Sequence, residues 1–266
     1  MNQGRQRPRE LQDNHPSLMP ADEAAEMIID VRDVSFRWNT ASFPVFESAN
    51  LNVQRSDRVF IEGPSGSGKS TLLSLLAGVI TPQRGSITVL GQRVDALSSG
   101  QRDRFRADHI GFIFQMFNLI PYLSVVENVT LPCRFSALRR ERALRSAPNL
   151  DGAALALLDG LDMAGGDIVD RPVNELSVGQ QQRVAAARAL MGAPEVLIAD
   201  EPTSSLDTDL REDFIKLLFD RCAEEGTTLV FVSHDRSLEG LFDRTIRLTG
   251  SKGPLILNNQ EGETLS

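Results

Sequence analysis

Apolar and polar residues alternate along residues 28–62, a period typical of β-strands with one buried face. The apolar positions of this stretch include Val31, Val34, Phe36, Leu51, Val53, Val59 and Ile61. The pattern predicts β-hairpin structure that leads into residues 63–71. A further strand is predicted at 87–90, directly before a glycine.

Continuous apolar runs indicate a second kind of strand later in the chain. Residues 195–199 and 228–232 are short apolar runs, typical of strands buried on both faces of a parallel sheet. Residues 110–114 form another short strand candidate. Helices are predicted at 71–77, 151–161 and 180–191. This order predicts one α/β core, interrupted by a helical subdomain at about residues 97–175.

The ends of the chain differ in character from this core. Residues 1–26 hold Pro8, Pro16 and Pro20 among many charges and little apolar periodicity, which predicts a disordered N-terminal tail. The main domain is expected at 27–250, followed by a C-terminal tail at 251–266. Within the helical subdomain, the charged segment 136–150 contains Pro148 and is predicted to be a loose connection between helices.

One glycine-rich segment lies between a predicted strand and a predicted helix. It fits the phosphate-binding pattern G-x-x-x-x-G-K-[ST] at every required position. Glycines let backbone N–H groups approach and surround an anion, and a helix N-terminus adds positive potential. A lysine then meets the β- and γ-phosphates, and a serine hydroxyl is a ligand suited to Mg²⁺. The segment is Gly63, Pro64, Ser65, Gly66, Ser67, Gly68, Lys69, Ser70 and Thr71.

Charge and composition narrow the range of partners. The 266 residues carry a net charge of −8, which disfavours nucleic acid as a partner, so phosphates must be bound by a local positive site. Cys133 and Cys222 are not in C-x-x-C spacing, which fits a reducing cytoplasm. No apolar stretch approaches the roughly 18–20 residues that span a bilayer. We therefore expect membrane contact only through a partner.

Polar residues follow both of the buried strands. Asp200 and Glu201 end one strand, and His234 follows the other. Ligands of open α/β sheets bind beyond the carboxyl ends of the strands, so these side chains are expected to face the phosphates. One carboxylate suits the Mg²⁺ shell, and the other suits activation of water. For the Asp200–Glu201 pair taken alone, the simpler alternative is a polar turn. For His234 taken alone, it is a histidine bonded to backbone.

Taken together, these motifs resemble the nucleotide-binding subunit of an ATP-binding cassette (ABC) transporter. Residues 176–180, Leu-Ser-Val-Gly-Gln, are similar to the family signature Leu-Ser-Gly-Gly-Gln. Residues 198–201 resemble the end of its Walker B strand, and 204–207 its D-loop. His234 resembles the switch histidine, Gln115 the Q-loop and Trp38 the A-loop aromatic. The resemblance implies an α/β fold with a P-loop NTPase core, an antiparallel β subdomain and an inserted helical subdomain.

The chain departs from the family pattern at two positions. Val178 replaces the first glycine of the signature pair, and its side chain disfavours positive φ. We expect Gly179 to provide the close approach to phosphate. Trp38 replaces a more usual tyrosine and offers a larger π face for adenine; Phe36 is the alternative for this role.

The resemblance also implies a mechanism. Two copies would form a head-to-tail dimer around two ATP molecules with Mg²⁺, each nucleotide capped by the partner's signature residues. Glu201 would be the general base, with His234 and Lys69 on the phosphates. Mg²⁺ would be held by Ser70, Gln115 and Asp200. The cap and its surroundings would include Ser177, Gly179, Gln180 and Asp207.

The segment 114–129 resembles the lipoprotein-release, macrolide-exporter and glycolipid-exporter branch of the family. That branch implies a separate integral membrane permease, contacted through residues 116–123, and a peripheral position on the cytoplasmic face of the inner membrane. The sequence favours equally an alternative in which residues 116–123 are buried in the core of the helical subdomain. Alternatives are an ATPase acting on a cell-division membrane partner, and a soluble non-transport ABC ATPase.

Overall fold

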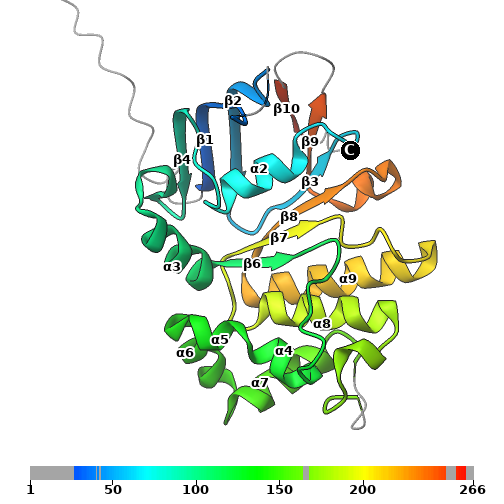
Figure 1. Ribbon diagram of the computed structural model, residues 1–266. Coiled ribbons are helices and arrows are strands. Elements are labelled where there is room, and N and C mark those ends of the chain that lie inside the picture. The colour runs from blue at the N-terminus through cyan, green and yellow to red at the C-terminus, as the bar shows by residue number, and fades with distance from the viewer. Residues whose placement is uncertain (1–26, 40, 42, 164–167, 250–255, 262–266) are drawn as a thin grey trace, which may run out of the picture.

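The structure, a computed structural model, describes residues 27–39, 41, 43–163, 168–249 and 256–261. Two sheets and a set of helices stack into layers (Figure 1). The tail predicted at 1–26 lies outside the described residues. No helix among the described residues combines the length and the apolar character that a membrane crossing needs.

The first layer is an antiparallel sheet in the order β2-β1-β4-β5. Its inward side chains alternate with exposed ones, as the sequence pattern predicts, because only one face of this sheet is buried. The strands are β1 (Met27–Phe36), β2 (Phe46–Gln54), β4 (Arg84–Val89) and β5 (Gln92–Arg93).

The second sheet forms the centre of the molecule, in the order β10-β9-β3-β8-β7-β6. All neighbouring strands in it are parallel except β10, which runs antiparallel to β9. The strands are β3 (Arg58–Glu62), β6 (Ile110–Ile113), β7 (Val196–Asp200), β8 (Thr228–Ser233), β9 (Arg244–Thr249) and β10 (Ile256–Glu261). Strand β10 lies in the segment for which the sequence predicts a C-terminal tail.

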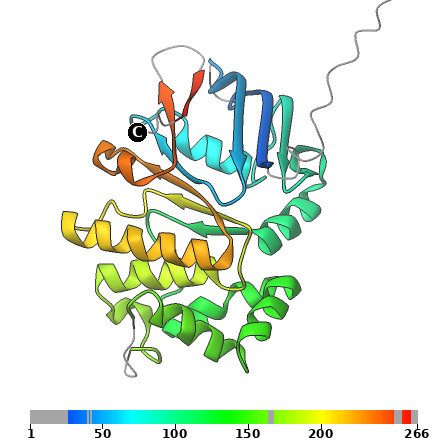
Figure 2. The ribbon, with the colours of Figure 1, turned by 180° about the vertical axis from the view of Figure 1, so that it is seen from behind.

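Both faces of the central sheet are covered, which explains the continuous apolar runs of β3, β6, β7 and β8. Helix α2 (Lys69–Leu76) packs its leucines between the two sheets. On the opposite face, α8 (Val178–Leu190) and α9 (Thr208–Glu225) lie side by side (Figure 2). This sandwich brings the carboxyl ends of β3, β7 and β8 to one edge.

The remaining helices lie mostly at one end of the molecule, next to α8 (Figure 1). Helix α3 begins with a capping box, in which Ser98 and Gln101 bond each other's backbone N–H groups. These helices are α3 (Ser99–His109), α4 (Val125–Thr130), α5 (Pro132–Phe135), α6 (Ala137–Ser146) and α7 (Leu150–Asp159). Short 3₁₀ turns are η1 (Val94–Ala96), η2 (Val173–Glu175) and η3 (Arg236–Leu241).

Helix α6 corrects the prediction of a loose connection at 136–150. Ser136 caps it by accepting a hydrogen bond from the Arg139 backbone N–H at 3.0 Å, and it ends just before Ala147 and Pro148. Its many arginines hide the helical pattern in the sequence. In the structure two of those arginines, Arg139 and Arg142, face inward and donate to the Ala189 carbonyl and the Glu195 carboxylate.

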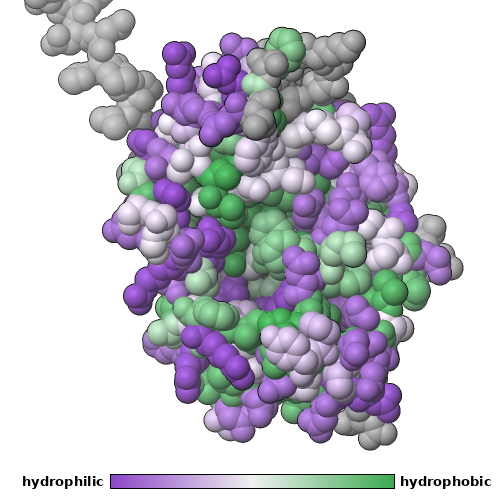
Figure 3. All heavy atoms as spheres, in the orientation of Figure 1, coloured by the Kyte–Doolittle hydropathy of each residue, from purple (hydrophilic) through white to green (hydrophobic). Residues whose placement is uncertain are grey.

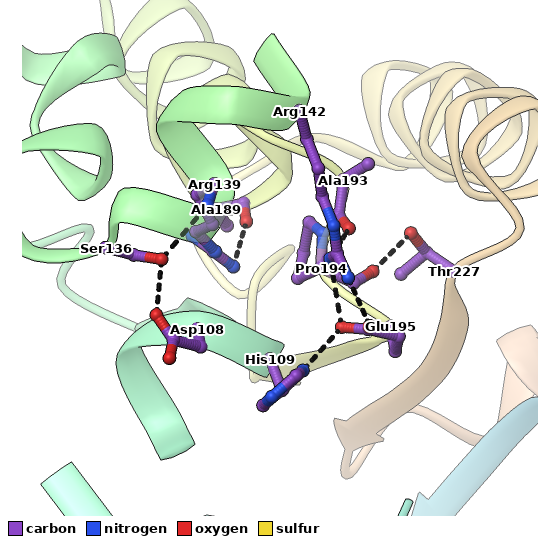
Figure 4. Close-up of polar contacts among 10 residues, drawn as sticks. All are labelled: Asp108, His109, Ser136, Arg139, Arg142, Ala189, Ala193, Pro194, Glu195 and Thr227. Atoms are coloured by element: carbon purple, nitrogen blue, oxygen red, sulfur yellow. Dashed lines mark hydrogen bonds and ion pairs between the residues drawn. The ribbon is translucent and has the colours of Figure 1, made fainter. Parts of the chain in front are cut away.

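Figure 4 shows these partners around Glu195, which precedes β7. Its carboxylate accepts hydrogen bonds from Arg142 on α6 at 2.6 Å and contacts His109 Nδ1 at 3.0 Å. Burial alone raises the Glu195 pKa, but the bonds from His109 and Arg142 outweigh it and lower the pKa to about 2. Glu195 therefore ties the helical region to the central sheet.

Candidate nucleotide site

Strand β3, the glycine-rich segment and α2 follow one another as the phosphate-binding pattern requires. Gly68 is the N-cap of α2 with φ of 89°, a left-handed conformation that favours glycine. At Gly63 a Cβ atom would lie 2.4 Å from Ser67 Oγ and 3.1 Å from the Leu248 carbonyl oxygen, so a side chain there would force its neighbours to move. The loop therefore curls tightly, with the first N–H groups of α2 unsatisfied by the helix itself.

The Lys69 ammonium folds back over this loop. Its Nζ donates to the carbonyl of Gly63 at 2.6 Å and of Pro64 at 3.2 Å, and lies 3.8 Å from Glu201 Oε1. These neutral carbonyl acceptors hold the Lys69 ammonium at the opening of the loop. Phosphate oxygens placed there would offer Lys69 stronger, charge-assisted partners.

The predicted strand-end residues meet the loop at the same edge. Ser70 Oγ donates to Asp200 Oδ2 at 3.5 Å, and His234 Nδ1 lies 2.8 Å from Glu201 Oε2. The pKa of Asp200 is raised, first by burial and then by the neighbouring charge of Glu201. Glu201 has φ of 48°, an unusual conformation for a residue with a side chain, and such strain concentrates at functional sites.

These groups surround a cavity of about 810 Å³, large enough for a nucleotide. Most of the predicted site residues line this cavity, and they come from five separate parts of the chain. Its lining consists of Trp38, Val45, Pro64, Ser65, Gly66, Gly68, Lys69, Ser70, Thr71, Gln115, Asp200, Glu201 and His234.

Trp38 forms one wall of this cavity. Its ring meets Phe36 edge-on at 5.0 Å between centroids, and its Nε1 donates to Thr71 Oγ1 at 3.4 Å. Trp38 as a residue is 44% exposed, which leaves it accessible to a ligand. Val45 lies in the same wall and is absent from the sequence prediction, because a single apolar residue in a loop carries no signal of binding.

Six predicted residues do not line the cavity: Gly63 and Ser67 belong to the phosphate loop itself, and four others lie at helix N-termini outside it. Ser177 and Gln180 cap α8 reciprocally: Ser177 Oγ accepts from the Gln180 N–H at 3.3 Å, and Gln180 Oε1 accepts from the Ser177 N–H at 3.0 Å. Gly179 lies in the first turn of α8, and Asp207 is the N-cap of α9. Ser177, Gly179 and Gln180 form the polar N-terminus of α8, and Gly179 there lies close to Leu206 of the D-loop.

Val178 fits this terminus without strain. It is the first residue of α8 and does not have a positive φ. The second position of the pair faces open space, since a Cβ on Gly179 would meet only Leu206, at 3.8 Å. The exchange of glycine for valine therefore leaves the helix N-terminus intact.

The glycine-rich loop, lysine and strand-end carboxylates on a parallel sheet define a phosphate-loop ATPase. The chain belongs to the ABC transporter family, whose profile matches residues 46–204. It is an ATP-binding ATPase subunit of that family.

Relatives and solved structures agree with this assignment. The chain is 40% identical over 230 residues to the uncharacterized ABC transporter ATP-binding protein YbbA of Escherichia coli K12, covering 86% of this chain and 97% of the relative. It is 37% identical over 209 residues to the lipoprotein-releasing system ATP-binding protein LolD of Xanthomonas oryzae pv. oryzae strain MAFF 311018, covering 79% and 82%. The dimeric ATP-binding cassette MJ0796 bound to ADP and Pi matches with TM-score 0.72 and 32% identity, covering 88% and 98%.

Proposed function

We propose that two copies of this chain clasp two ATP molecules head to tail and hydrolyse them to drive a membrane permease. One observation carries this proposal. The phosphate loop, Glu201 and His234 line one cavity, whereas Ser177 and Gly179 lie at the N-terminus of α8, outside it. A second copy would supply that terminus to the open side of the nucleotide, where its N–H groups meet the γ-phosphate.

The phosphates would be bound mainly by electrostatics. The N-terminus of α2 contributes oriented N–H groups, and Lys69 exchanges its carbonyl partners for phosphate oxygens. The adenine would stack on the ring of Trp38. The positive groups that bind the phosphates are confined to this site, which is consistent with a chain whose overall charge is negative.

Mg²⁺ would be held by Ser70 Oγ and the Asp200 carboxylate, with Gln115 on the same cavity wall. These are hard oxygen ligands, as Mg²⁺ prefers, and the nucleotide and water would complete its shell. The described residues hold no cluster of three or more His, Cys, Asp or Glu side chains that could bind a metal without the nucleotide. When bound, the ion neutralises charge on the transferred phosphoryl group.

Glu201 would accept the proton of the attacking water, and His234 would contact the γ-phosphate. An ionised Glu201 only accepts hydrogen bonds, so the His234 Nδ1 in contact with it carries a proton. A neutral imidazole then has no second N–H for phosphate. Nucleotide binding would therefore separate the pair, releasing the carboxylate toward water and the N–H toward phosphate.

The permease would contact the face between the central sheet and the helical region. Figure 3 shows apolar side chains gathered in a hollow there. Met116, Tyr122 and Phe135 are more than 70% exposed, and a neighbouring cavity of about 840 Å³ is lined by six arginines and one acidic residue, Asp103. A partner segment with apolar and acidic side chains suits this surface.

We further propose an exporter of lipoprotein, lipid or other hydrophobic cargo, with the chain peripheral on the cytoplasmic face of the inner membrane. The similarity to LolD and the resemblance of residues 114–129 support this branch. The test is reconstitution with its permease in liposomes. We expect release of inorganic phosphate from Mg-ATP by the purified chain, stimulated by the permease and abolished by Lys69→Met. Equal turnover by the parent and Lys69→Met would contradict the proposal.

A further inference from the structure

The guanidinium group of Arg211 connects two loops that carry predicted site residues. Arg211 lies in the first turn of α9. Its Nη2 donates to the carbonyl of Leu206 at 3.1 Å, and its Nη1 forms an ion pair with the carboxylate of Asp235. Leu206 precedes the D-loop residue Asp207, and Asp235 follows His234. The Arg211 side chain therefore contacts the residues next to Asp207 and His234.

The two loops are held together at two levels. Close to the ends of β7 and β8, Glu201 contacts His234, and the Glu201 N–H donates to the carbonyl of Val232 at 2.9 Å. Further along both loops, Arg211 makes the second connection. If nucleotide binding separates Glu201 from His234, the Arg211 contacts are the side-chain bridge that keeps the loops in register.

Asp235 offers Arg211 a fixed and charged partner. Its Oδ1 accepts from the Ser237 hydroxyl at 2.7 Å and from the Ser237 N–H at 3.0 Å, which caps η3. These bonds to Ser237, and next the nearby charge of Arg211, hold the pKa of Asp235 below its usual range. The carboxylate is therefore ionised and oriented near neutral pH.

Arg211 itself has little freedom. About four-fifths of its side chain is buried, and its Nε is buried without a hydrogen-bond partner among the described residues. A cavity of about 460 Å³ is lined by Arg211, Asp235 and His234, and His234 also lines the nucleotide cavity. The Arg211–Asp235 pair thus lies one side chain behind the nucleotide site.

We propose that Arg211 is a positioning residue for ATP hydrolysis, which fixes the D-loop relative to His234. The inference rests on the proposed function. It assigns Arg211 no contact with nucleotide, so its loss should slow turnover and leave nucleotide affinity unchanged. A misplacement of reacting groups by about 1 Å can lower the rate about 100-fold.

The experiment measures kcat, KM and nucleotide affinity for Arg211→Met, Arg211→Lys, Asp235→Asn and the double variant Arg211→Met/Asp235→Asn. We expect kcat to fall about 10- to 100-fold in Arg211→Met, with unchanged affinity. Arg211→Lys keeps the charge but lacks the planar fork that reaches both partners, so rescue should be partial. The double variant should be no slower than Arg211→Met alone, because both changes remove one interaction.

Arg221→Met is the matched control. Arg221 lies on the same helix, forms an ion pair with Glu224 and also has a buried Nε without a partner among the described residues. Its contacts lie far along α9 from the D-loop, so kcat should stay at the parental value. If Arg211→Met does not fold, Arg211→Lys and Asp235→Asn carry the same comparison.

Three results would overturn the inference: parental kcat in Arg211→Met, a double variant slowed by the product of the single effects, or affinity that falls as much as kcat. An inactive parent in the same assay would instead reject the proposed function. An active parent with unaffected Arg211 variants would reject the positioning role alone.

Discussion

His234 Nδ1 lies 2.8 Å from Glu201 Oε2, and the same glutamate lies 3.8 Å from Lys69 Nζ. Glu201 thus contacts both His234 and Lys69. In the proposed reaction, each of these contacts involves an atom that the chemistry would use. A bound nucleotide would replace these contacts with its own. Glu201 would then be free to accept a proton from water, and His234 would be free to contact the phosphate.

Replacing Glu201 by glutamine should preserve ATP binding and slow hydrolysis by about 10²- to 10⁴-fold, the usual share of a positioned general base. Glutamine keeps the size of the side chain but accepts no proton. Single-turnover phosphate release and binding of a fluorescent ATP analogue would measure both effects. Parental turnover by Glu201→Gln would show that another group activates water.

Trp38 is the only tryptophan in the chain, so its fluorescence reports directly on its own surroundings. If adenine stacks on its ring, ATP should change the emission, and triphosphate without a base should not. Trp38→Ala should weaken ATP binding about 2- to 10-fold, the usual worth of an aromatic contact. Trp38→Phe retains a π face and should lose less. Equal ATP affinity of the parent, Trp38→Ala and Trp38→Phe would show that the adenine does not bind against Trp38.

The raised pKa of Asp200 predicts how Mg²⁺ binding depends on pH. A carboxylate must lose its proton to bind the ion. Its affinity for Mg²⁺ should therefore fall as the pH is lowered, beginning at a higher pH than for an ordinary aspartate. In Glu201→Gln the neighbouring charge is gone, so the fall should shift to lower pH. Titrations of Mg²⁺ against bound nucleotide at several pH values would measure this, and identical curves would contradict it.

Glu195 should stabilise the fold against unfolding, with a defined pH dependence. Its pKa falls from 4.5 to about 2 on folding, so its contribution is complete above about pH 4.5 and is lost as the pH falls toward 2. Glu195→Gln should lower the free energy of unfolding by about 2 to 3 kcal/mol at neutral pH, a gap that closes in acid.

Urea unfolding of both proteins across this range would measure the gap. Glu141→Gln is the control, since the exposed Glu141–Arg145 pair on α6 should contribute little. A gap for Glu195→Gln that does not vary with pH would assign the effect to packing.

Sequence pattern predicted four strands of the central sheet, β3, β6, β7 and β8, and the phosphate loop, because their signals are local. Buried parallel strands are continuously apolar, and the loop needs glycine, lysine and serine at fixed spacing. The capping box that begins α8 at Ser177 is also a local feature, since it lies within four residues.

What sequence could not predict depends on partners far along the chain. Helix α6 was missed because its inward-facing arginines are matched by residues about 50 positions away, such as Ala189 and Glu195. Strand β10 forms against β9 without a strong apolar pattern of its own. Val45 and Arg211 come close to the site only in the folded chain, where loops distant in sequence lie side by side.

If ATP is held between two copies of this chain, the nucleotide should control dimerisation. Sedimentation velocity of Glu201→Gln, with and without Mg-ATP, measures this, because slow hydrolysis preserves the bound state. We expect monomers without nucleotide and dimers with it, and loss of the dimer in Glu201→Gln/Ser177→Glu, where a negative charge opposes the γ-phosphate. A protein that remains monomeric at saturating Mg-ATP would contradict it.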